Sequence, residues 1–209
     1  MATTPEVDRP SELIRLVELL GITAERVTLH LAEDGNWTDR NQINEWHIHM
    51  ARLIAAYLMA AYLLGRGDKN AQPSPLDTQN LEQVYHSQLE NLAGFADTIR
   101  HSDEWGPGYP VRARSYAMGI QPGYWIGHYS LHLPAYPGDG STQCGNNCGC
   151  QWDIQPVDAA NGDWDCYWVR YLQDSCETCV AREQAWSPFR VRGGTWQTST
   201  EIMGLAQQA

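Results

Sequence analysis

Apolar side chains recur every three or four positions through most of the first half of the chain, which is the spacing typical of amphipathic α-helices. Serine, threonine or aspartate begins each periodic run as a suitable N-cap, and glycine follows most of the runs. The helices predicted in this way cover residues 11–21, 23–35, 38–65 and 77–99. The longest, 38–65, presents one continuous apolar face and is expected at the centre of a helical bundle.

The pattern changes after residue 101. Proline and glycine interrupt the aromatic-rich stretches EWGPGYP, QPGYW and LPAYPGDG, which are predicted to be turns and extended segments, with one short helix over PVRARSYAMG. Two strands are predicted over CQWDIQ and DCYWVRYL, joined by the turn-rich PVDAANGD. A final short helix is predicted over SCETCVAREQAW.

These elements predict an α+β fold. An N-terminal α-helical bundle-like region precedes a small, loop-rich β region that is Cys-stapled and zinc-ribbon-like. The predicted parts are a helical region over 1–103, an aromatic connecting segment over 104–140, a Cys-rich module over 141–196 and a tail arm over 197–209. The tail is weakly patterned and is expected to become ordered only on a partner.

Charge and hydropathy narrow the classes of partner. The net charge is −11 and Lys69 is the only lysine, whereas binding to nucleic acid or to an anionic membrane surface depends on basic side chains. The longest apolar run, Leu53–Leu64, would extend about 18 Å as a helix, and no secretion signal is recognised at the N-terminus. We therefore expect no nucleic acid, no membrane, and a chain made in a reducing host cytoplasm.

All six cysteines lie between 144 and 179. In an extended strand Trp164, Cys166 and Trp168 share one face, so Cys166 is expected to be a small buried hydrophobic residue. The others form two groups whose spacing resembles the paired ligand turns of a tetrahedral zinc site. These candidate metal ligands are Cys144, Cys148, Cys150, Cys176 and Cys179.

Zinc requires four ligands, so one of the five thiols is in excess. Cys144 and Cys148 are favoured in the first group, with Cys150 as the substitute, although their C-x-x-x-C spacing is looser than the usual C-x-x-C. Three disulfides and a set of inert thiols are the alternatives. Since four cysteines leave no open position for water, zinc would be structural.

A second candidate metal site lies on the longest predicted helix. Glu45 and His49 are one turn apart, and the next helix carries Glu82, His86 and Glu90. A dimetal bundle site would use Glu-x-x-His spacing from two helices, which this set lacks, so these residues are expected to form a solvated polar face. No G-x-S-x-G, HExxH or phosphate-binding glycine motif occurs, and the chain is expected not to be an enzyme.

The run LPAYPGDGSTQCGNNCGCQW, followed by CYWVRYLQDSCETCVAREQAWSPF, resembles the C-terminal cysteine-rich segment of minor head (head-morphogenesis) proteins of tailed bacteriophages. The resemblance covers about residues 110–190 and supports the five candidate ligands as the residues that organise this segment. It implies a structural protein of the virion, located in the phage head. Family members are usually longer and engage the portal through an extended segment, whereas the front of this chain is compact and helical.

A short, acidic, aromatic-rich virion protein is most simply a capsid cement or decoration protein that stabilises the head shell. The alternatives are a minor head protein near the portal and a zinc-ribbon adaptor between proteins. The expected partners are the major capsid protein and a second copy of the chain, with a dimer formed through the apolar face of the longest helix. The aromatic residues expected to anchor the interface are Trp105, Tyr109, Tyr124, Trp125, Tyr129 and Tyr136.

Overall fold

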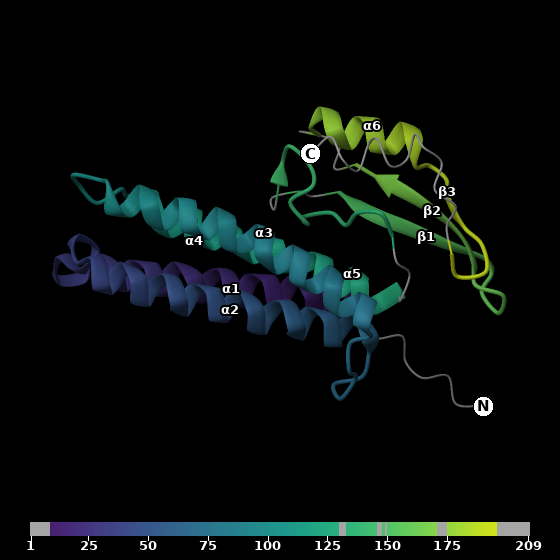
Figure 1. Cartoon of the computed structure of the whole chain (residues 1–209), viewed down its shortest axis with the longest axis horizontal. Coiled ribbons are helices and arrows are strands. Elements are labelled where there is room, and N and C mark those ends of the chain that lie inside the picture. Colours follow the sequence, from purple (N-terminus) through teal and green to yellow (C-terminus); the bar gives the residue numbers. More distant parts are fainter. Residues whose placement is uncertain (1–8, 130–132, 146–147, 149, 171–174, 196–209) are drawn as a thin grey trace.

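A computed structural model describes residues 9–129, 133–145, 148, 150–170 and 175–195. Five α-helices form an elongated bundle, and a small antiparallel sheet with a sixth helix lies beside one end of it (Figure 1). The predicted α+β fold is therefore confirmed. The helices of the bundle are α1 (Arg9–Ala32), α2 (Arg40–Arg66), α3 (Pro75–Arg100), α4 (Tyr109–Ser115) and α5 (Gln121–Tyr129), with 3-10 turns η1 (Glu33–Thr38) and η2 (Tyr116–Ile120).

Helix α1 is one continuous helix, so the prediction of two short helices was wrong. Gly21 does not end it, because the missing side chain makes room for α4 and η2. A Cβ atom at this position would lie 3.1 Å from Cγ of Arg114. Thr23 does not cap a new helix, since its hydroxyl donates to the carbonyl of Leu19 one turn earlier at 2.7 Å.

Helices α2 and α3 confirm the two longer predictions, with small shifts at their ends. Asp39 caps α2 by accepting the N–H of Asn41 at 2.8 Å, and Gly67, with φ of 67°, ends it two residues later than predicted. Helix α3 begins before the predicted cap. Ser74 and Asp77 form a reciprocal capping box, in which each side chain accepts the backbone N–H of the other.

The short helix predicted over PVRARSYAMG is confirmed by α4 and η2, whereas the prediction of a turn or extended chain over QPGYW was wrong, because α5 begins there. Helix α5 packs along α2, and its two glycines face the α2 backbone. A Cβ atom at Gly123 would lie 2.5 Å from the carbonyl oxygen of Leu58, and one at Gly127 would lie 2.2 Å from that of Tyr62. These two glycines permit close packing of α5 on α2. Gly123 had been interpreted from the sequence pattern as part of a turn or extended segment.

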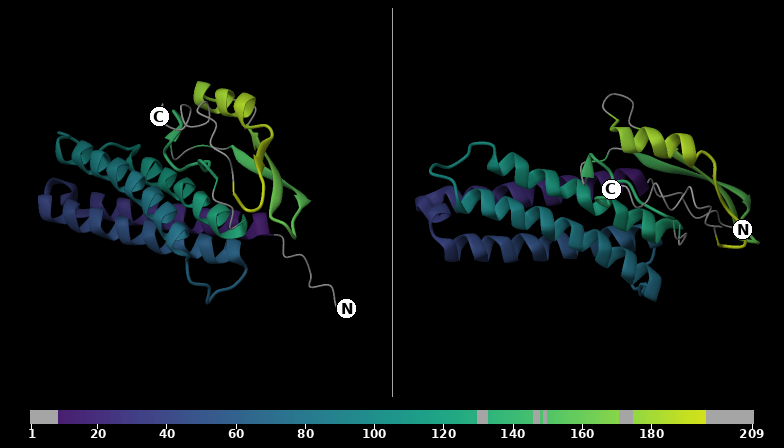
Figure 2. Two further views of the ribbon diagram at one scale, coloured as in Figure 1. Left: turned by 45° about the vertical axis from the view of Figure 1, so that its right-hand side comes forward. Right: turned by 45° about the horizontal axis from the view of Figure 1, so that its top comes forward.

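The sheet consists of β1 (Gln151–Asp158), β2 (Asp163–Val169) and β3 (Phe189–Val191) in that order. The first two confirm the predicted hairpin, and their register pairs Trp152 with Trp168 and Ile154 with Cys166. Strand β3 was not predicted, because three residues carry too little pattern. Helix α6 (Glu177–Ala185) confirms the last predicted helix and packs against β2 over one face of the sheet (Figure 2).

The described residues from 133 to 195 are called the cysteine module below. Its core is continuous with one end of the bundle, since one cluster of buried side chains includes Leu20 and Tyr62 as well as Trp152 and Trp168. A second cluster, around Trp46 and Phe95, fills the other end of the bundle. The cysteine module is therefore packed onto the helices and shares a core with them.

Helix α2 satisfies, in length and composition, the usual criterion for a helix that can span a membrane, which its twelve-residue apolar run had not suggested. About a third of that apolar window, 33%, is buried inside the structure. Core helices of water-soluble proteins meet the same criterion, and α2 packs against α1, α3 and α5.

Candidate metal centre

The loop before the first cysteine is built around a buried carboxylate. Asp139 accepts the backbone N–H groups of Tyr136 at 2.7 Å and of Ser141 at 2.8 Å, and also the Ser141 hydroxyl. Gly138 and Gly140 flank it with φ of 82° and 87°, values that favour glycine. The PGDG stretch therefore folds into a compact turn that leads directly to Cys144. Burial raises the pKa of Asp139.

Five sulfur atoms converge behind this loop. The Sγ atoms of Cys144, Cys148 and Cys179 all lie within 4.8 Å of one another. Cys144 Sγ is 3.4 Å from Cys176 Sγ and 3.8 Å from Cys179 Sγ, and Cys148 Sγ is 3.7 Å from Cys179 Sγ. Cys150 interacts with Cys179 as well. We call these five residues the cysteine cluster.

The spacing of the cysteine cluster fits a metal bound by thiolates. A tetrahedral zinc site with Zn–S bonds of about 2.3 Å separates its sulfur atoms by about 3.8 Å. A disulfide would require about 2.05 Å, and none of the six cysteines, all of which are described, is disulfide-bonded. The cluster is therefore arranged within metal-binding distance.

The start of helix α6 positions two of the sulfur atoms. Cys176 is the N-cap residue and Cys179 follows inside the first turn, where backbone N–H groups point toward the sulfurs. Gln143 fastens this end to the preceding loop by accepting the N–H of Glu177 at 3.2 Å. Burial acts to raise the pKa of Cys176, but backbone hydrogen bonds from Cys179 and Cys144 lower it to about 7.

Two other thiols of the cluster, those of Cys144 and Cys179, ionise less readily than a free cysteine. Burial raises the pKa of Cys144 to about 11. The pKa of Cys179 is raised by hydrogen bonds with Cys148 and Cys150, and by its burial. Because neighbouring thiolates repel one another, a cation bound among the sulfurs would favour their ionised forms.

The sixth cysteine lies apart from the cluster, as predicted. Cys166 is in β2, fully buried, and its pKa is raised to about 12 by burial. The indole of Trp168 beside it is also buried, whereas Trp164 is partly exposed. The prediction that Cys166 is a small hydrophobic core residue is confirmed.

A buried arginine, which the sequence pattern did not reveal, lies next to the cysteine cluster. Arg182 of α6 is fully buried, and its Nη2 donates to the carbonyl and the hydroxyl of Ser141 at 2.8 and 3.0 Å. Its guanidinium lies over the rings of Trp168 and Trp186, at 5.2 and 4.9 Å from their centroids. Burial lowers the pKa of Arg182, whereas Asp139 and cluster thiols act in the opposite direction.

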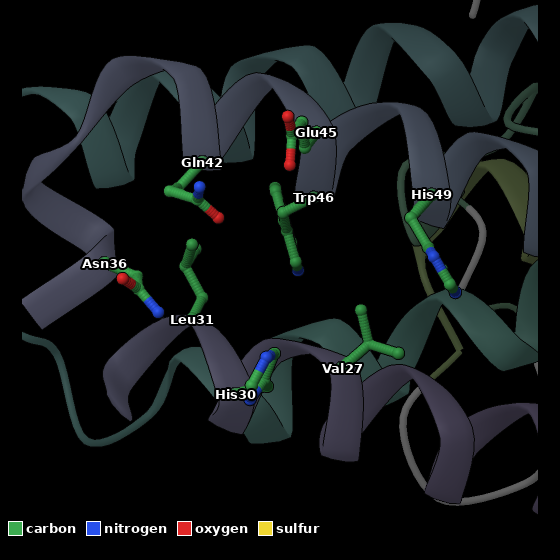
Figure 3. Close-up of a pocket in the computed structure, with 8 residues that line it drawn as sticks. All are labelled: Val27, His30, Leu31, Asn36, Gln42, Glu45, Trp46 and His49. Atoms are coloured by element: carbon green, nitrogen blue, oxygen red, sulfur yellow. The ribbon is translucent and has the colours of Figure 1, made fainter. Parts of the chain in front are cut away.

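The alternative metal site in the bundle is not assembled. Glu45 and His49 line a pocket of about 220 Å³ with His30 of α1 (Figure 3), whereas Glu82 lines a different groove between α2 and α3. His30 Nδ1 is 2.6 Å from a carboxylate oxygen of Glu33. Among the described histidine, cysteine and acidic residues, only the cysteine cluster brings three ligand atoms within metal-binding distance.

Most of the aromatic residues expected at an interface pack within the chain. Tyr124 and Tyr136 are buried in the core, so their predicted exposure was wrong. Trp105 and Tyr109 are partly buried against each other with ring centroids 5.1 Å apart, and Trp125 is partly buried against Tyr124. The prediction for Tyr129 concerns a side chain outside the described part of the chain.

No family model matches the chain, and searches of curated proteins and of solved structures gave no significant match. The function is therefore inferred from the chemistry of the site and from the motifs of the sequence.

Proposed function

We propose that this chain is a structural, non-enzymatic protein of a bacteriophage head, in which a zinc–thiolate centre holds the cysteine module in one conformation. The observation that carries the proposal is the convergence of five cysteines, all from the segment that resembles phage head-morphogenesis proteins, on one point beside the bundle. A stable, closed metal site supports a role in assembly, where shape has to persist.

The proposed metal is zinc, bound by Cys144, Cys148, Cys176 and Cys179. Thiolates favour zinc over harder divalent cations, and four of them close its tetrahedral shell. The Sγ atoms of Cys144, Cys148 and Cys179 lie within 4.8 Å of one another, and Cys176 Sγ is 3.4 Å from Cys144 Sγ. Cys150 is therefore proposed to pack behind the centre as a thiol.

The proposed role in the head is that of a cement protein. The apolar face of α2 that was expected to form a dimer packs largely inside its own bundle. Exposed apolar residues remain on α1, at successive spacings of five, three and seven, which at about 100° per residue place them within an arc of about 140° on one side of the helix. They are Ile14, Leu19, Ile22 and Leu29.

This face of α1 is proposed to contact the major capsid protein across the seams of the shell. Cement stabilises a shell by mass action, in proportion to how much more tightly it binds assembled subunits than free ones. The net charge of −11 favours a position away from packaged DNA, hence on the outer surface.

Purified virions test the proposal. We expect many copies per particle, with about one zinc per chain. Particles assembled without the protein should form but break at lower temperature. The double variant Ile22→Glu and Leu29→Glu should fold yet fail to join particles, whereas Val157→Glu, an equally exposed position on β1, should join normally.

Other outcomes contradict parts of the proposal. Particles that lack the protein and fail to package DNA or attach tails would favour the minor head role over the cement role. Virions that lack the chain altogether would refute the phage proposal and favour a zinc-ribbon adaptor, which should form a soluble complex with one partner.

A further inference from the structure

Arg182 is the one basic side chain that is buried among the described residues. Of its three guanidinium nitrogens, Nη2 hydrogen-bonds to Ser141, whereas Nε and Nη1 are buried without a hydrogen-bond partner. A guanidinium removed from water costs several kcal/mol unless negative charge lies close to it. The two flanking indole rings supply part of this compensation through cation–π contacts.

The buried carboxylate of Asp139 also acts electrostatically on Arg182, but its described hydrogen bonds are made with its own loop. It accepts three hydrogen bonds from its own loop, and the described hydrogen bonds of Arg182 end on Ser141. The charge of Asp139 therefore reaches Arg182 across Ser141.

The remaining source of negative charge is the cysteine cluster. Cys179 and Arg182 are three residues apart on α6 and therefore lie on the same side of the helix. Cys179, Cys148 and Cys176 all act electrostatically on Arg182. These three sulfurs come from both halves of the cluster, and Asp139 acts on Arg182 in the same direction.

We propose that Arg182 is the buried counter-cation of the metal–thiolate centre, and this inference rests on the proposed zinc site. Zn²⁺ with four thiolates carries a net charge of about −2, of which one guanidinium cancels half. The stabilisation is reciprocal: the loaded centre offsets the burial of Arg182, and Arg182 raises the affinity of the cluster for the metal.

The test measures zinc affinity by competition with a chelator in the full-length protein. Arg182→Met, which keeps the length of the side chain without the charge, should weaken zinc binding by about 10- to 100-fold. Arg182→Lys should retain most of the affinity. The matched control is Arg170→Met, which removes a partly exposed arginine that is paired with Glu183 of the same helix.

Cobalt substitution provides a second readout. The absorption bands of tetrahedral Co²⁺–thiolate should keep their positions in Arg182→Met, because the ligands are unchanged, while the Co²⁺ titration shifts to higher metal concentration. Equal zinc affinity in Arg182→Met and the unmodified protein would overturn the inference and leave the zinc site intact. Equal losses in the Lys and Met variants would overturn it too, since packing and not charge would then be responsible. If the unmodified protein bound neither metal, the proposed zinc site itself would fail.

Discussion

The helical bundle and the cysteine module share a core but differ in the kind of polar group that they bury. In the bundle, the buried hydroxyl of Thr28 accepts the indole N–H of Trp46 at 3.0 Å, and the hydroxyl of Tyr62 donates to Asp77 at 3.1 Å. In the module, the indole N–H groups of Trp168 and Trp186 are buried without a hydrogen-bond partner, as are two nitrogens of Arg182. Both regions leave some buried polar atoms without a described partner, among them the side-chain amide of Gln88 in α3, but the module also buries a cation and a cluster of thiols.

This difference indicates what each region needs in order to fold. The bundle buries apolar side chains along its helices, and this burial stabilises it without a ligand. The module buries a cation beside closely spaced thiols, and a bound metal with thiolate ligands would place negative charge near that cation. Removing the metal should therefore loosen the cysteine module while the helical bundle stays folded.

The largest expected effect follows from the loss of the metal. Cys179→Ser removes the sulfur that contacts all the others in the cluster, so zinc should be lost and the module should loosen between residues 140 and 190. Structural zinc contributes on the order of 10 kcal/mol to small sites. Limited proteolysis should locate new cleavage in the module, while helical circular dichroism changes little.

Cys166→Ala is the matched control for this experiment, since it removes a buried cysteine outside the cluster. It should keep the full zinc content and cost about 1 kcal/mol through the small cavity. If the cysteine module of chelator-treated, metal-free protein resisted protease as well as that of the zinc-bound protein, the module would not need the metal in order to fold, and the proposed difference between the two regions would be wrong.

A smaller effect is expected from the contact between α5 and α2. Gly127→Ala places a methyl group about 2.2 Å from the carbonyl oxygen of Tyr62, which forces the helices apart. Overpacking of this kind costs about 1–3 kcal/mol. Urea denaturation followed by circular dichroism should show the loss, and the zinc content should remain at one per chain.

Gly94→Ala makes the same change in α3, where nothing lies within 4 Å of the added Cβ atom. Because alanine favours helix more than glycine, this control should stabilise the bundle by about 0.5–1 kcal/mol. If both alanine variants changed stability in the same direction, close packing would not explain Gly127.

The same glycines show where sequence reasoning succeeds and fails. Helix α2, the hairpin of β1 and β2, and α6 follow from local periodicity and were predicted. Gly21, Gly123 and Gly127 look identical to turn glycines until the helices that pack against them are known. Local pattern cannot separate these two uses, since the difference depends on residues far away in the chain.

The candidate site divides in a similar way. Cysteine spacing predicted the cluster, and strand alternation set Cys166 apart from it. The role of Arg182 was missed, because it depends on a contact with Ser141, 41 positions earlier in the chain. The PGDG stretch was noticed as a turn, but its buried Asp139 becomes apparent only when the loop is folded around the carboxylate.

The smallest expected effect concerns alkaline pH and the bundle alone. Burial raises the pKa of Tyr116, in the core cluster around Trp46 and Phe95, from 10 to about 12, although Arg112 acts to lower it. The unfolded chain therefore ionises this phenol first, so its contribution to stability is complete below pH 10 and is lost as pH rises toward 12. Tyr116→Phe should lose about 1 kcal/mol less stability than the unmodified protein between pH 8 and pH 11. Urea denaturation of both proteins at pH 8 and pH 11 measures this difference in the free energy of unfolding. The difference between the two proteins at pH 8 gives the effect of removing the hydroxyl itself, which is then subtracted. Parallel losses in the two proteins would mean that the phenol ionises as readily inside the bundle as in water, which its exposure of only 6% makes physically costly.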